Sequence, residues 1–252
     1  MNIRITRQLA TVVAIFTSLT ATLSAIAAPE TGAPLKPPAT QSIVVAVTDE
    51  PGHIVRYRSP RFVAYTNNFV PGDWTLYHQH RNDLLAVIAG DTVAINQKLG
   101  GEPGEQSVPA GTVAFFPYAD MPDGYVHRVS VGGAKPFINI GIDFPEPVPG
   151  PERRALVPAW DGIGVKAIAE NRRGRAYRME LAGGQSLALP ACGSALLVVV
   201  LSNATINFSS SGNEPSRWET ASGDFKFFET SRPQQIGNAA ASAASVIVFL
   251  AY

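Results

Sequence analysis

The sequence contains little of what marks several common classes of protein. A single cysteine, Cys192, stands among 252 residues, so an intrachain disulfide is excluded. Charged residues make up only 16% and the formal net charge is zero, with no basic stripe among aromatic residues. These features argue against a nucleic-acid partner. Beyond the N-terminal segment, no apolar run is long enough to span a membrane.

Helical periodicity is also scarce, and the best candidate for a helix is the weak pattern over residues 165–173. The chain has 22 glycines and 20 prolines. Its apolar runs are short, rich in Val, Ile, Phe, Thr and Tyr, and separated by turn residues, a pattern typical of β-sandwiches and β-barrels. The composition therefore predicts an all-β protein.

The first 28 residues have the pattern of a cleaved secretory signal peptide. Arg4 and Arg7 precede an apolar run, and residues 25–27 form an A-x-A cleavage site. An uncleaved membrane anchor is the alternative. We expect cleavage at this site or one residue later, a periplasmic or secreted protein, and no stable membrane insertion afterwards. Residues 29–42 then form a proline-rich linker.

The chain has only four histidines, and three of them point to one site. His78 and His80 are two residues apart in a strand-like run, so their side chains share a face. His127 lies in a second strand-like run, GYVHRVSV. We expect the three imidazoles to converge on a metal ion. His53 follows a Pro-Gly pair and is interpreted as a turn residue.

The order of these segments resembles the cupin superfamily. That family has a first motif of the form G-x5-H-x-H-x(3,4)-E-x6-G and a second motif that begins P-x-G and contains a later histidine. The resemblance covers residues 43–144, and it implies a jelly-roll β-barrel with a metal site. The residues that match are Gly72, His78, His80 and Gly90 in the first motif, and Pro109, Gly111 and His127 in the second.

The fourth ligand implied by the resemblance is altered. The family has a glutamate there, whereas this chain has Asp83, shorter and one residue closer to His80. Asp83 could ligate the metal, accept the second N–H of a ligand histidine, or lie in solvent. The predicted metal ligands are thus His78, His80 and His127, with Asp83 as a candidate fourth. They suit one divalent transition metal: Fe, Mn, Ni, Cu or Zn.

The second half of the chain resembles the first at an offset of 112 residues. Ala64-Tyr65 then falls on Ala176-Tyr177, the run at 84–91 falls on 196–203, and Phe137 falls on Phe249. We interpret this as a duplication, which predicts a bicupin. Residues 43–148 would form a metal-binding barrel and residues 155–252 a degenerate one.

The degenerate barrel lacks the ligands at this offset. His78, His80 and His127 fall on Pro190, Cys192 and Ala239, and no histidine follows His127. A lone cysteine is insufficient for a stable metal site, so we expect Cys192 to be a small buried hydrophobe.

Strand alternation gives candidates for the substrate pocket. Trp74 and Leu76 share parity with His78 and His80 and are expected to line the interior, whereas Arg128 has opposite parity to His127 and should point away. Phe115 or Phe116, Tyr118 and Tyr125 are candidates for the mouth of the pocket, and alternation does not decide which of them line it. The predicted substrate-binding residues are Trp74, Leu76, Phe116 and Tyr118, and the sequence indicates no catalytic acid or base.

Three functions remain open. The first is a metal-dependent enzyme of oxygenase or isomerase type, such as a dioxygenase-like oxidoreductase, acting on a small organic molecule. The second is a non-catalytic protein of the cell envelope that binds or senses a small molecule. The third is a barrel without metal. Fold alone does not choose among them, and a homodimer is left open.

Overall fold

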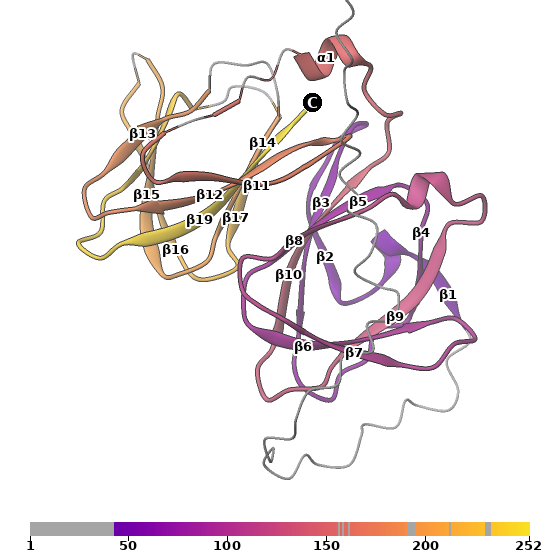
Figure 1. The fold of residues 1–252 in the computed structure, drawn as a ribbon. Helices are drawn as coiled ribbons and strands as arrows, with labels where there is room; N and C mark the ends of the chain where they lie inside the picture. Colours follow the sequence, from indigo (N-terminus) through magenta and orange to yellow (C-terminus); the bar gives the residue numbers. More distant parts are fainter. Residues whose placement is uncertain are drawn as a thin grey trace, which may run out of the picture. The chain divides into compact units, whose positions relative to one another are not determined.

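The computed structural model describes residues 43–155, 157, 159–160, 162–190, 195–211, 213–229 and 233–252. As expected from composition, nearly all regular elements of the described chain are β-strands (Figure 1). The strands form four sheets, two from each half of the sequence. None of the described helices is long and apolar enough to cross a membrane.

The first half of the sequence forms a barrel of two five-stranded sheets. One sheet has the order β1-β4-β9-β6-β7 and the other β2-β3-β10-β5-β8. The elements are β1 (Val44–Ala46), η1 (Val47–Asp49), β2 (His53–Arg58), β3 (Val63–Phe69), β4 (Tyr77–His80), β5 (Asp83–Ile88), β6 (Thr92–Lys98), β7 (Gly104–Val108), β8 (Val113–Phe116), η2 (Tyr118–Asp120), β9 (Tyr125–Val131) and β10 (Phe137–Phe144).

The second half repeats the arrangement with sheets β11-β12-β19-β14-β17 and β13-β18-β15-β16. A short helix, α1 (Pro151–Ala155), precedes it. The strands are β11 (Val165–Asn171), β12 (Gly174–Leu181), β13 (Ser186–Ala188), β14 (Leu196–Val200), β15 (Ala204–Ser209), β16 (Ser216–Thr220), β17 (Phe225–Phe228), β18 (Gln235–Asn238) and β19 (Ala244–Ala251). The second barrel is filled by apolar side chains, among them Met179, Leu196, Val198, Ile206 and Val248.

The two barrels share an apolar core. Alternate residues of β5 and β10, such as Leu85 and Ile142, pack in one cluster with Leu197 and Phe249 of the second barrel. The other residues of β5 face the interior of the first barrel, so all six β5 residues are buried. Complete burial of such side chains contributes roughly 1.5–3 kcal/mol each. The second barrel therefore covers one face of the barrel that carries the histidines.

The strand pairing confirms the offset of 112 residues in part and corrects it in part. Leu84 of β5 and Leu196 of β14 occupy equivalent positions, each opposite the end of the last strand of its barrel. Phe137, however, pairs with Phe69, whereas Ala244 pairs with Leu181. For the last strand, the offset between equivalent residues of the two barrels is 107 rather than 112, because the connection before β18 is shorter in the second barrel. The match of Phe137 to Phe249 was wrong, and the counterpart of His127 is Gln234 rather than Ala239.

Two further expectations need correction. Residues 165–173 form strand β11 and the following turn, not a helix, because the segment pairs antiparallel with β12. His53 is not a turn residue. It begins β2 and is 6% exposed. The expectation for Cys192 lies outside the described residues.

Candidate metal centre

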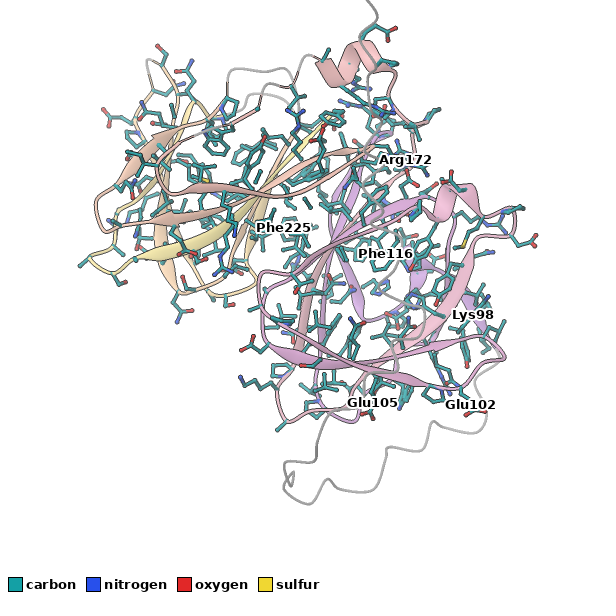
Figure 2. All side chains as sticks on the ribbon, in the orientation of Figure 1. Lys98, Glu102, Glu105, Phe116, Arg172 and Phe225 are labelled. Carbon is teal, nitrogen blue, oxygen red and sulfur yellow. The ribbon has the colours of Figure 1, made fainter. Side chains whose placement is uncertain are left out.

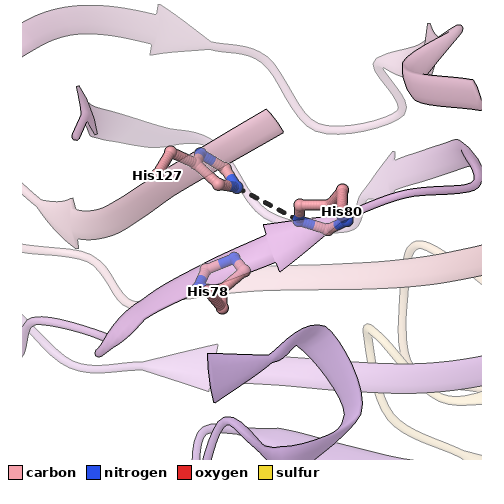
Figure 3. A group of neighbouring side chains, drawn as sticks. All are labelled: His78, His80 and His127. Atoms are coloured by element: carbon pink, nitrogen blue, oxygen red, sulfur yellow. Dashed lines mark hydrogen bonds between the residues drawn. The ribbon is translucent and has the colours of Figure 1, made fainter. Parts of the chain in front are cut away.

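Three histidines from two neighbouring strands meet inside the first barrel. His78 and His80 alternate along β4, and His78 lies directly opposite His127 of β9. One ring nitrogen of each lies within 4.8 Å of the others, and Figure 3 shows the rings turned toward one another. The side chains are only 1%, 2% and 8% exposed. The structure thus brings together the three residues that the sequence predicted as ligands.

Hydrogen bonds at the outer nitrogens orient two of the rings. Nδ1 of His78 donates to the carbonyl oxygen of Leu76 at 3.0 Å. Nδ1 of His127 donates to Oδ1 of Asn96 at 2.8 Å. Since Nδ1 holds the proton in each case, Nε2 of both rings offers a lone pair to the centre. Such outer partners are typical of metal-binding histidines.

His80 carries the clearest sign that the centre suits a cation. Its Nε2 lies 3.1 Å from Nε2 of His127. Because Nε2 of His127 carries a lone pair and no proton, the contact is favourable only if His80 holds its proton on Nε2. Nδ1 of His80 is then an acceptor, and it faces another acceptor, Oδ1 of Asp143, at 3.9 Å. Both atoms are buried without a hydrogen-bond partner in the described chain. A cation at Nε2 would return the proton to Nδ1, facing the carboxylate.

The separation of the nitrogens also fits. Two nitrogens about 2.0–2.1 Å from one ion, at angles between square and tetrahedral, are roughly 2.9–3.4 Å apart. The observed 3.1 Å between the Nε2 atoms falls in this range. The donor set and its spacing therefore fit a divalent transition metal.

The electrostatics of the site disfavour charged imidazoles. Burial, reinforced by neighbouring histidines, lowers the pKa of His78 to about 2 and the pKa of His127 well below its ordinary value. Burial likewise lowers the pKa of His53 to about 4, although its bond to Val47 opposes this. These rings are neutral at physiological pH, as a metal ligand must be.

Asp83, the candidate fourth ligand, has other partners. Its carboxylate is fully buried and is bound by two arginines of the second barrel: Arg172 Nε at 2.8 Å and Arg173 Nε at 2.6 Å. It is not part of the three-histidine group. The carboxylate of Asp143 instead lies beside the histidines, with Oδ1 3.9 Å from Nδ1 of His80.

The four predicted substrate-binding residues fall into two groups in the structure. Trp74 does not share the face of the histidines, because the pairing of β4 with β9 shifts by one residue before Tyr77, where Trp74 bridges to Ser130. Its ring instead packs on the Arg128 guanidinium, 4.6 Å from its centroid, together with Tyr77. Arg128 points away from His127 as expected, but it is buried. Leu76 contributes its carbonyl group to His78.

The other two residues form an aromatic wall beside the histidines. The rings of Phe116 and Tyr118 stack nearly parallel, and Tyr118 stacks in turn on Tyr125. The ring of Tyr118 lies 5.1 Å from that of His80, and Tyr125 lies 5.0 Å from His127. We call Phe116, Tyr118 and Tyr125 the aromatic wall.

Two buried groups near the site were not predicted. The ring of His53 lies 4.6 Å from that of His78, and its Nδ1 donates to the Val47 carbonyl at 2.7 Å. The Glu50 carboxylate accepts N–H bonds from Gly52 and Leu76 at 2.7 and 3.2 Å. Burial raises the pKa of Glu50, although these bonds oppose the shift. In the sequence, the Glu50-Pro-Gly-His53 run looked like an ordinary turn and gave no signal of this contact.

Comparison with known proteins gives the fold and no closer relationship. No family model matches the sequence, and no curated protein matches it. Among solved structures, AerE from Microcystis aeruginosa has a TM-score of 0.52 at 11% identity, covering 81% of this chain and 98% of its own. A cupin 2 conserved barrel domain protein from Leptotrichia buccalis has a TM-score of 0.50 at 11% identity, covering 79% and 88%.

A dioxygenase is among the similar structures. A variant of salicylate 1,2-dioxygenase from Pseudoaminobacter salicylatoxidans, in complex with gentisate, has a TM-score of 0.55 at 13% identity, covering 82% of this chain and 75% of its own. The architecture and the place of the three histidines agree with the motif resemblance. The chain has the cupin fold, with jelly-roll barrels and a histidine triad able to bind metal.

Proposed function

We propose that this protein is an exported bicupin that holds one divalent transition metal on His78, His80 and His127 and acts on a small organic molecule. The observation that supports it best is the convergence of three buried imidazoles, each with one ring nitrogen within 4.8 Å of the others. A carboxylate among the ligands is not required. Asp143 lies near enough to offset part of the cation's charge through His80.

The residues around the centre suit an oxygenase-type reaction. A three-histidine metal leaves coordination positions open, and when bound it supplies Lewis acidity or activation of O₂. The aromatic wall provides an apolar surface that excludes water from the side of His80 and His127. Apolar lining around a few polar groups is the usual composition of a small-molecule site. The gentisate complex of the similar dioxygenase supports a small organic ligand of this kind.

A second candidate is a non-catalytic binding or sensing protein. It is favoured by the closed state of the centre, where no ligand histidine is more than 8% exposed. An ion held so deeply serves a structural or sensing role unless the wall moves. Turnover of small aromatic acids by metal-loaded protein under air separates the two candidates.

We further propose that residues 1–28 direct export and are removed, so that the mature protein is periplasmic or secreted. The supporting pattern is the basic start, the apolar run and the A-x-A site. N-terminal sequencing of protein from the native host tests this. Membrane-bound protein that retains Met1 would refute it.

The decisive experiment on the site is metal analysis of wild-type protein and of His80→Ala. We expect one metal per wild-type chain and near-complete loss in the variant. Free metal at a hundred times its dissociation constant should stabilise the wild type by about 2.7 kcal/mol, and the variant little. Equal metal content in a variant with all three ligands replaced by alanine would refute the assignment. Two metals per chain would show a site in the second barrel.

A further inference from the structure

Two arginines of the second barrel, Arg172 and Arg173, contact the first barrel. They stand in the tight turn between β11 and β12, where Asn171 Oδ1 accepts the N–H of Arg173 at 2.7 Å. Arg173 is 2% exposed and binds Asp83 and the carbonyls of Glu146 and Pro147, the latter two at 2.9 Å. These contacts connect the turn to the first barrel. Arg172 makes an additional set of contacts.

Arg172 bridges two separate segments of the first barrel. Its Nε and Nη2 bind both oxygens of Asp83, and its Nη1 binds both oxygens of Asp120 at 2.8 and 2.9 Å. One planar guanidinium thus holds two carboxylates, a geometry that lysine cannot reproduce. Arg172 is labelled in Figure 2, as is Phe116 of the aromatic wall.

Both carboxylates stand next to parts of the histidine centre. Asp83 begins β5, three residues after His80 ends β4. Asp120 ends η2, the single turn that begins with Tyr118. Tyr118 in turn contacts the ring of His80. A change at Arg172 can therefore reach His80 along two routes: through the β4–β5 connection and through η2.

We propose that Arg172 is a positioning residue for the histidine centre, by which the second barrel fixes the aromatic wall against His80. The inference rests on the proposed metal site for its functional meaning, but the contact itself does not depend on a metal. The proposed role of Arg172 means that the second barrel helps to position the histidine centre of the first barrel. A purely structural role would affect stability alone.

The expected increase in amide exchange in η2 follows from the exposure of the side chains. Asp120 is 62% exposed and Arg172 24%, so Asp120→Asn should speed exchange in η2 by about two- to fivefold. Arg172→Met also removes one partner of the fully buried Asp83 carboxylate, so we expect it to speed exchange in η2 by about tenfold or more. Arg172→Lys should restore only part of the loss. Arg175→Met is the matched control, because Arg175 lies in the same hairpin, is 26% exposed and pairs with Glu170 of its own barrel.

Two measurements on the full chain test the inference. The first is amide hydrogen exchange of metal-free protein at residues 118–124, where Met121 N–H donates to the Tyr118 carbonyl. The second is the visible spectrum of the Co²⁺ protein at a temperature where every variant is folded. We expect Arg172→Met and Asp120→Asn to speed exchange in η2 and to alter the Co²⁺ spectrum, and Arg175→Met to do neither.

The outcomes separate the two proposals. If Arg172→Met lowers the melting temperature while η2 exchange and the Co²⁺ spectrum stay as in the wild type, Arg172 is only a structural contact and the inference is wrong. If Arg172→Met does not fold, Asp120→Asn decides in the same way, since it leaves Asp83 paired. Failure of the wild type to bind Co²⁺ would refute the metal site, and η2 exchange would still decide the positioning role.

Discussion

Replacement of Asp83 by asparagine should destabilise the protein far more than it weakens metal binding. Asp83 is the residue for which the family motif and the structure differ most. The resemblance suggests a ligand, whereas both carboxylate oxygens are engaged by Arg172 and Arg173. Asparagine keeps the shape and removes the charge, so the variant tests the two roles directly.

The expected magnitude follows from burial. Asp83 has no exposed surface, and breaking a buried ion pair by removing one partner costs about 3–5 kcal/mol. That is a large part of the roughly 5–15 kcal/mol that stabilises a typical domain. In urea it corresponds to a fall in midpoint of roughly 1 M or more. Because the carboxylate is already occupied, metal affinity should fall by at most about tenfold.

The effect should depend on pH in a defined direction. Burial alone would raise the pKa of Asp83, but the bonds from Arg172 and Arg173 outweigh it and hold the pKa below its ordinary value of 3.8. The ion pair therefore stabilises the wild type above about pH 4, and this stability is lost as pH falls through the lowered pKa. The gap between wild type and Asp83→Asn should narrow in acid.

The assay combines urea unfolding of metal-free protein with metal titration of the folded protein. Asp91→Asn is the control, because Asp91 is an exposed aspartate paired with Lys135 on the surface. If Asp83→Asn unfolds like the wild type but binds metal a hundredfold more weakly, Asp83 is a ligand and the anchoring role is refuted.

Three further predictions concern the surroundings of the histidines. Asp143→Asn should weaken metal binding by about 10–100-fold, measured by competition with a chelator, because it removes the carboxylate beside His80; an unchanged affinity would leave Asp143 without this role. Glu50→Gln should weaken binding less, since Glu50 contacts no histidine of the triad and acts on His78 only through the Leu76 N–H, next to the carbonyl that orients the ring. An effect larger than that of Asp143→Asn would contradict this order. Metal-free protein should lose stability as pH falls from 6.5 toward 4, because His53, with its pKa lowered to about 4, is neutral when folded and takes up a proton when unfolded; a urea midpoint that is constant over this range would show that the histidines are not buried.

The sequence was sufficient to predict that His78 and His80 share a face because the underlying rule is local, whereas His127 was added from a second strand-like run and the order of the motifs. Two residues at i and i+2 of a regular strand must share a face, and β4 is regular from Tyr77 to His80. The rule failed at Trp74 for the same reason. The segment before Tyr77 is not part of the strand, and a shift of one residue turns a side chain to the other face.

Contacts between distant segments could not be predicted. Glu50 accepts a hydrogen bond from Leu76, which lies 26 residues away in the sequence, and Asp143 of β10 lies beside His80. Their positions depend on how ten strands are ordered in two sheets, which no spacing in one sequence specifies. The same limit applies to Asp83, because the arginines that bind it lie about ninety residues away.

The role of the second barrel follows from what it retains. At the positions of His78 and His127 it has Pro190 and Gln234, and its interior is filled by apolar side chains. Such a barrel has no imidazoles with which to bind metal, yet it covers one face of β5 and β10 and supplies both arginines to Asp83. Deleting it would expose an apolar sheet and leave a buried carboxylate unpaired, so the first barrel should not keep its histidine centre alone. The proposed metal site lies in one barrel, but residues of both barrels make the contacts around it.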